Sequence, residues 1–328
     1  MTSLKTFGIH WPFFAAWTLA WLAGIESVSF GQQPAIPKQT TDFRVAGYLP
    51  NYRGDQIDEL AMSRITDLIL FSAEIQPDGS LDLKRLSSMP WERIKRLKTT
   101  YRVRLILCVG GWERSRGFSE MASDKKLRAS FIRSAIDVCA AYRLDGVDLD
   151  WEHPKDEKEQ QGYATILREM RAAFQPHGLC LSITMAAWQS VPKEAFEAVD
   201  WIQVMSYDHP GKHSTLEGAK ADIDRLRAAG APVAKLTLGL PFYGRKVGDH
   251  NQVKTYRELN RAKLSEDIDE WEGYYFNGAR MIRDKVAYAA EAGLAGVMIW
   301  ELGQDAKGDG SLLKEIQKAV HSAKPAAP

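Results

Sequence analysis

The sequence predicts a single α/β domain, a (β/α)8 TIM barrel over residues 44–322. Eight short apolar runs rich in Val, Ile and Leu follow one another from residue 44 onward, and amphipathic stretches lie between several of them. Nearly continuous apolar runs are typical of parallel strands that helices cover. The length agrees as well, because barrels of this class typically contain about 250 residues. A doubly wound open sheet is the alternative, but it does not require eight strands in so regular an order.

The predicted strands lie, in chain order, at residues 44–48, 65–75, 103–109, 144–150, 179–186, 201–207, 235–241 and 294–300. Amphipathic stretches at 124–142, 160–174, 219–229 and 279–292 are predicted helices. Gly178, Gly230 and Gly293 follow three of these stretches closely, as expected where glycine ends a helix. The pair Gly110-Gly111 after the third strand indicates a tight turn rather than a nucleotide-binding loop.

Both ends of the chain are predicted to lie outside the barrel. Lys5 precedes an apolar stretch at residues 11–25, and small residues follow at 29 and 31, so residues 1–31 are predicted to be a signal peptide. The stretch is shorter than the ~20 residues that cross a membrane, and an uncleaved anchor is the alternative. Residues 32–43 are predicted as a linker and 323–328 as a disordered tail. We therefore expect a secreted or periplasmic protein with no membrane span in the mature chain.

Composition excludes several classes of function. The chain has 43 Lys and Arg against 42 Asp and Glu, so it lacks the basic excess that nucleic-acid binding requires. No Cys/His spacing resembles a metal site, and we expect neither a metal nor an organic cofactor. The three cysteines, Cys108, Cys139 and Cys180, lie in apolar stretches and are predicted to be buried, with one pairing among them as the alternative. We expect a monomer.

Three acidic residues alternate along the end of the fourth predicted strand: Asp148, Asp150 and Glu152. Side chains alternate along a strand with a period of two, so the three carboxyls share one face, and the residues between them, such as Trp151, share the other. Active sites of these barrels lie at the carboxyl ends of the strands. Like charges at ~6.5–7 Å spacing oppose ionisation, so at least one carboxyl retains its proton near neutral pH. Glu152, the outermost, is the predicted general acid, and a salt-bridge network is the alternative.

Other strand ends supply rings and polar groups that suit a sugar, because aromatic rings stack on sugar faces. Tyr207 offers a hydroxyl donor beside the three acids and is grouped with them as a catalytic candidate. The predicted substrate-binding residues are Tyr48, Trp112, Trp188, Met205, Asp208, Tyr243, Arg245 and Trp300.

The segment Asp145-Gly-Val-Asp-Leu-Asp-Trp-Glu152 resembles the Asp-Gly-x-Asp-x-Asp-x-Glu signature of family-18 glycoside hydrolases, the chitinase family. The resemblance extends over roughly residues 45–302. Gly110-Gly111 is similar to the family's glycine pair after the third strand, and Met205-x-Tyr207-Asp208 is similar to its sixth-strand motif. Trp300 is similar to the tryptophan that forms the bottom of the family's substrate pocket.

This resemblance implies a substrate-assisted retaining mechanism, which needs no enzyme nucleophile. Glu152 would protonate the glycosidic oxygen while the substrate's own N-acetyl carbonyl attacks the anomeric carbon. Asp150 would orient the acetamido group and balance its positive charge, and Asp148 would support Asp150. Tyr207 would bind the acetamido oxygen, and Asp208 would help to hold the distorted sugar. The implied partner is a β-1,4-linked polysaccharide or oligosaccharide that contains N-acetylglucosamine.

Two features depart from the family pattern. Cys108 stands where the family often has a serine that supports the innermost acid, and a thiol is a weaker hydrogen-bonding group. Residues 244–293 leave little room for the α+β insertion that many members carry, so we expect a loop and a helix there. A shallower, more open groove would favour random endo cleavage or a smaller substrate over processive exo action.

Two other functions are compatible with the same barrel. An endo-acting N-acetylglucosaminidase on glycans or peptidoglycan would use the same catalytic residues. The alternative that is not an enzyme is a chitin-binding lectin. Catalytically inactive members of the family typically lack the acid at the position of Glu152, whereas this chain retains it.

Overall fold

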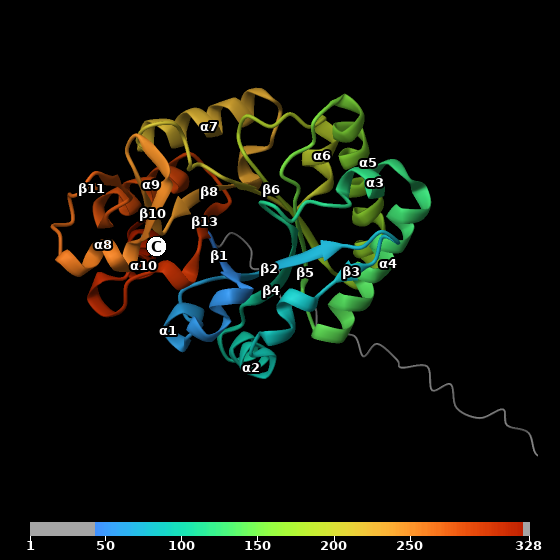
Figure 1. The fold of residues 1–328 in the computed structure, drawn as a ribbon, viewed down its shortest axis with the longest axis horizontal. Coiled ribbons are helices and arrows are strands. Elements are labelled where there is room, and N and C mark those ends of the chain that lie inside the picture. Colours follow the sequence, from blue (N-terminus) through green and yellow to red (C-terminus); the bar gives the residue numbers. More distant parts are fainter. Residues whose placement is uncertain (1–42, 324–328) are drawn as a thin grey trace, which may run out of the picture. The chain divides into compact units, whose positions relative to one another are not determined.

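The predicted strands close into a barrel in the computed structural model, which describes residues 43–323 (Figure 1). The eight parallel strands are β1 (Arg44–Pro50), β2 (Asp67–Ile75), β4 (Arg104–Gly110), β5 (Gly146–Asp150), β6 (Cys180–Met185), β7 (Trp201–Val204), β8 (Leu236–Pro241) and β13 (Gly296–Trp300). Strand β1 pairs with both β2 and β13, which closes the ring. A short strand, β3 (Leu81–Asp82), adds to β2 in the antiparallel direction. The predicted fold class is therefore confirmed.

Helices flank the strands (Figure 1). They are α1 (Glu59–Met62), α2 (Trp91–Tyr101), α3 (Phe118–Ser123), α4 (Lys125–Tyr142), α5 (Glu157–Phe174), α6 (Lys193–Ala198), α7 (Leu216–Ala228), α8 (Tyr256–Leu259), α9 (Ala279–Glu291) and α10 (Leu312–Ala323). The four helices that the sequence predicted are α4, α5, α7 and α9. Three of these four start at a side-chain cap, formed by Asp124, Asp156 and Thr215. The predicted stop glycines after α5, α7 and α9 all have positive φ.

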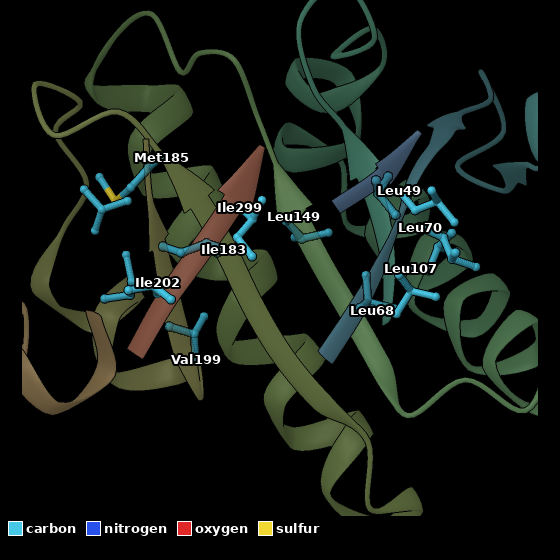
Figure 2. Packing of buried hydrophobic residues seen from close by; sticks show 14 of the residues in the cluster. Leu49, Leu68, Leu70, Leu107, Leu149, Ile183, Met185, Val199, Ile202 and Ile299 are labelled. Atoms are coloured by element: carbon cyan, nitrogen blue, oxygen red, sulfur yellow. The ribbon is translucent and has the colours of Figure 1, made fainter. Parts of the chain in front are cut away.

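Alternation along the strands produces two apolar clusters. On β2, Leu68 and Leu70 belong to a cluster shared with the helices, whereas Ile69 and Phe71 belong to a smaller cluster of residues that point the opposite way, into the barrel. Figure 2 shows side chains of the first cluster, among them Leu149 of β5. Tight packing on both faces of the strands fixes their register, so polar groups at the strand ends are held in defined positions.

Between β8 and α9 the chain forms a second, antiparallel sheet in the order β10, β9, β12, β11. Its strands are β9 (Tyr243–Lys246), β10 (Asp249–Thr255), β11 (Glu270–Trp271) and β12 (Tyr274–Tyr275). The expectation of a plain loop before the helix is therefore wrong. These strands are short, and β10 and β11 are largely polar or exposed, so no apolar alternation predicts them.

Several other predictions concern the interior and the ends of the chain. The three cysteines are free thiols, with Cys108 and Cys139 buried and Cys180 half-buried. None of the helices between residues 43 and 323 combines the length and the apolar character needed to cross a bilayer. The predicted signal peptide at 1–31, the linker at 32–43 except Phe43, and the tail at 323–328 except Ala323 lie outside the described residues.

Candidate active site

The three acids of the predicted motif lie inside the barrel at the end of β5, and we call Asp148, Asp150 and Glu152 the acid ladder. Trp151, between the last two, faces the opposite way and packs between Phe118 of α3 and Tyr163 of α5, with ring centroids at 5.2 and 5.4 Å. This large apolar anchor fixes the rotation of the strand end. The predicted alternation of acidic and apolar side chains is therefore confirmed.

Asp148 is the innermost member of the acid ladder and is completely buried. Its carboxyl accepts hydrogen bonds from Tyr48 Oη at 2.8 Å, Ser182 Oγ at 2.5 Å and Thr184 Oγ1 at 2.8 Å. Burial raises the pKa of Asp148, and these hydroxyl donors work in the opposite direction without cancelling the effect. Support of Asp148 consequently does not depend on a serine at the position of Cys108.

Asp150 is buried beneath the open end of the barrel and has few protein partners. Its Oδ1 atom has no hydrogen-bond partner among residues 43–323. Burial, followed by the charges of Glu152 and Asp148, raises the pKa of Asp150 well above its ordinary value. A buried acceptor without a partner is costly, so this oxygen is suited to receive a hydrogen bond from a ligand.

Glu152 completes the ladder at the cavity. Burial and then the charge of Asp208 raise the pKa of Glu152 to about 7. Nε2 of His153 lies 3.6 Å from Glu152 Oε2. No Lys or Arg within the described residues forms an ion pair with the ladder, which disfavours the salt-bridge alternative. Glu152 therefore holds a proton near neutral pH that it can transfer to a bound molecule.

A cavity of about 1030 Å³ opens above the ladder. It brings together every predicted site residue except Asp148, which lies behind Asp150. The predicted residues that line it are Tyr48, Trp112, Asp150, Glu152, Trp188, Met205, Tyr207, Asp208, Tyr243, Arg245 and Trp300. These residues come from seven strand ends far apart in the sequence, so the barrel assembles the site.

The aromatic residues divide into a floor and a rim. The ring of Trp300 packs edge-on against Phe71, with centroids 4.7 Å apart, and also contacts Tyr48. Trp112 and Trp188 are 69% and 63% exposed, so their faces are open to a ligand. Tyr48 lines the cavity as predicted, but its hydroxyl is engaged by Asp148 and Thr184. Tyr48 is therefore placed both to support Asp148 through its hydroxyl and to contact a substrate in the cavity.

Strand β7 ends at Val204, three residues earlier than the predicted end at 207, so Tyr207 and Asp208 lie in the loop that follows it. Residues of the small sheet hold Asp208. Tyr243 Oη donates to Asp208 Oδ1 at 2.6 Å, and Arg245 donates to both carboxylate oxygens, with Nη2 at 2.6 Å from Oδ2. Burial raises the pKa of Asp208, but the nearby imidazole of His213, whose Nδ1 lies 3.5 Å from Oδ1, and the hydrogen bonds from Arg245 and Tyr243 outweigh it, so the pKa lies below the usual range. Asp208 is therefore a carboxylate at neutral pH, whereas Glu152 retains a proton.

The glycine pair after β4 allows the backbone to pass close to the ladder. Gly110 and Gly111 have φ values of 98° and 102°, in the left-handed region that disfavours other residues. A Cβ atom on Gly110 would lie 2.3 Å from the backbone oxygen of Asp150. The predicted tight turn is therefore present, and its physical reason is contact with β5.

Sequence reasoning missed several residues of the site. Ser182 and Thr184 of β6 hold Asp148, and their i, i+2 spacing on a strand was the available signal. His153 lines the cavity, and its ring packs against Trp188 with centroids 4.6 Å apart. Phe71 lies under Trp300, but a single phenylalanine in an apolar strand gives no signal of this role. Within residues 43–323, no group of His, Cys, Asp and Glu side chains has the arrangement of a metal site.

Comparison with known proteins agrees with this geometry. The chain matches the model of glycosyl hydrolases family 18 over residues 44–305. Probable chitinase 2 of Drosophila melanogaster is 27% identical over 286 residues, which cover 66% of this chain and 59% of that protein. Chitinase 1 of Aphanocladium album is 24% identical, and the match covers 94% of each chain.

Solved structures show the same architecture. A GH18 chitinase, ChiB, from the chitin utilization locus of Flavobacterium johnsoniae superposes with a TM-score of 0.77 at 27% identity, over 86% of this chain and 95% of that one. The family match spans most of the chain and includes the acid ladder and all eight barrel strands. The chain therefore belongs to family 18 of the glycosyl hydrolases.

Proposed function

We propose that this protein hydrolyses β-1,4 bonds next to N-acetylglucosamine, in chitin or a related polymer, by a substrate-assisted retaining mechanism. The observation that carries the proposal is the pairing of Glu152, whose pKa burial raises to about 7 at the cavity, with a buried Asp150 whose Oδ1 has no hydrogen-bond partner among residues 43–323. The chitinases of Drosophila and Aphanocladium among its relatives support the same substrate class.

In the proposed reaction, Glu152 donates its proton to the glycosidic oxygen as the bond to the anomeric carbon breaks. The acetamido carbonyl oxygen of the substrate attacks that carbon and forms an oxazolinium ion. Asp150 accepts the acetamido N–H, and the positive charge that develops on the acetamido group lowers the raised pKa of Asp150, so that its carboxylate form balances this charge. Tyr207 donates to the acetamido oxygen. Burial raises the pKa of Tyr207 well above 10, so its hydroxyl keeps the proton that it must donate. Water then opens the ion while Glu152 acts as the base.

A pair of fluorogenic substrates tests the proposal. The protein is expected to release the fluorophore from a chitobioside or chitotrioside, and to leave the matching cellobioside intact. The two substrates differ in the 2-acetamido group, which supplies the nucleophile in this mechanism. Turnover of the cellobioside at a comparable rate would refute substrate assistance, and no turnover of either would refute hydrolysis. Product analysis on chitin oligomers, peptidoglycan fragments and N-glycans then separates a chitinase from an endo-N-acetylglucosaminidase.

The pH dependence of the rate provides an independent check. Because Glu152 must be protonated to act and its pKa is about 7, kcat/KM is expected to fall as pH rises above about 7. The fall approaches tenfold per pH unit once the acid is mostly ionised. The measurement is kcat/KM for a chitobioside from pH 5 to 9. A profile that stays level between pH 6 and 9 would show that no group of this pKa acts as the acid.

A further inference from the structure

One completely buried lysine lies behind the loop that carries Tyr207 and Asp208. Lys285 of α9 has no exposed surface. Its Nζ donates to Ser214 O at 2.9 Å, Ser214 Oγ at 2.7 Å and Asn277 Oδ1 at 2.8 Å. All three partners are neutral acceptors to which the side-chain nitrogen can donate. No carboxylate is among these contacts.

Ser214 is one end of a closed loop, residues 206–214. Its Oγ accepts from Lys285 and donates to the backbone oxygen of Ser206 at 2.9 Å, which joins the two ends of the loop. Asn277 Nδ2 also donates to Ser214 O at 2.7 Å. Lys285 on α9 and Asn277 just before α9 therefore both bind the backbone oxygen of Ser214. Between the two joined ends lies Asp208 at φ 63°, a conformation that its neighbours must maintain.

We infer that Lys285 is a positioning residue: its side-chain nitrogen anchors residues 206–214 and thereby holds Tyr207 and Asp208 at the cavity. The inference rests on the proposed function for the roles of those two residues. Lys285 itself touches no residue of the acid ladder and would contact no substrate. Its effect passes through Ser214 to the loop.

Burial lowers the pKa of Lys285 to about 7, and the charges of Asp269, Asp222 and Glu217 oppose this shift only partly. His213, in the loop 206–214, also interacts with Lys285, and burial lowers the pKa of that imidazole as well. If the loop opens, Lys285 reaches water and regains a pKa of roughly 10.4. At pH values between these two pKa values, Lys285 is neutral in the closed loop and protonated in the open loop, so opening of the loop binds a proton. The equilibrium constant for opening therefore falls by up to tenfold for each unit by which the pH rises.

Hydrogen exchange of the backbone amides in residues 206–214 tests this anchor without any ligand. After correction for intrinsic exchange, wild-type protection is expected to rise at least tenfold between pH 7 and 9. Lys285→Met keeps the length of the side chain without the amine, so its protection should not depend on pH and at pH 9 should be at least tenfold lower than that of the wild type. Lys220→Met, the same change at an exposed site on α7, should retain the wild-type slope. Equal slopes in wild type and Lys285→Met, or a level wild-type profile, would overturn the inference.

Ser214→Ala provides a milder variant in case Lys285→Met does not fold. It removes the hydroxyl that joins Lys285 to Ser206 O, so loop protection at pH 7 should fall at least threefold while the slope with pH remains. Unchanged protection would contradict the anchor. With a chitobioside, Lys285→Met should lower kcat/KM at least tenfold. Absence of hydrolysis in wild type together with the expected exchange pattern would refute the proposed function and leave the anchor supported.

Discussion

Replacement of Glu152 by Gln is expected to lower kcat for a chitobioside by roughly 100- to 10,000-fold, the usual range for loss of a positioned general acid. Gln has nearly the same shape but no proton of suitable acidity to give to the glycosidic oxygen. Burial supports the assignment, because it raises the pKa of Glu152 to about 7 and keeps that proton in place. Steady-state rates with the fluorogenic chitobioside measure the loss.

Binding distinguishes loss of chemistry from loss of the site. Chitotriose affinity, measured by calorimetry, should change by less than threefold in Glu152→Gln, because the rings and Asp208 remain. Glu194→Gln is the matched control, since Glu194 is exposed in the first turn of α6 and should leave both quantities unchanged. If Glu152→Gln retains wild-type turnover, another group is the acid.

The barrel and the ladder could be predicted from the sequence because both depend on period-two alternation. The run from Val147 to Glu152 places apolar and acidic side chains on opposite faces whatever the neighbouring strands contain. The β/α repeat then fixes which end of the barrel the acids occupy. These signals are local, so one sequence suffices to find them.

Features that depend on contacts between distant segments could not be predicted. The i, i+2 spacing of Ser182 and Thr184 places them on one face of a strand, but it does not show that they reach Asp148. Nothing in the local sequence shows that Arg245 of the small sheet holds Asp208. The small sheet was missed for a related reason, because its short strands are stabilised by pairing rather than by an alternating pattern. Lys285 is another example, because a lysine in an amphipathic helix is ordinarily expected to be exposed.

Asp150→Asn is expected to lower kcat by roughly 100- to 1,000-fold, as when one preorganised electrostatic partner of a transition state is removed. Asn fills the same space and can still accept a hydrogen bond from the acetamido N–H. It lacks the negative charge that balances the oxazolinium ion, so the loss should fall on kcat more than on KM. The burial of Asp150 strengthens this electrostatic effect, because water cannot screen the charge there.

The rate of a variant that combines Asp150→Asn with Glu152→Gln shows whether the carboxyls of Asp150 and Glu152 act in the same step. If Asp150 and Glu152 serve the same transition state, Asp150→Asn combined with Glu152→Gln should be little slower than the slower single variant. Asp224→Asn, at an exposed position of α7, is the control for the change of Asp to Asn and should have wild-type rates. Losses that multiply in full would mean that the two groups act independently, and the substrate-assisted scheme would then lack its central pair.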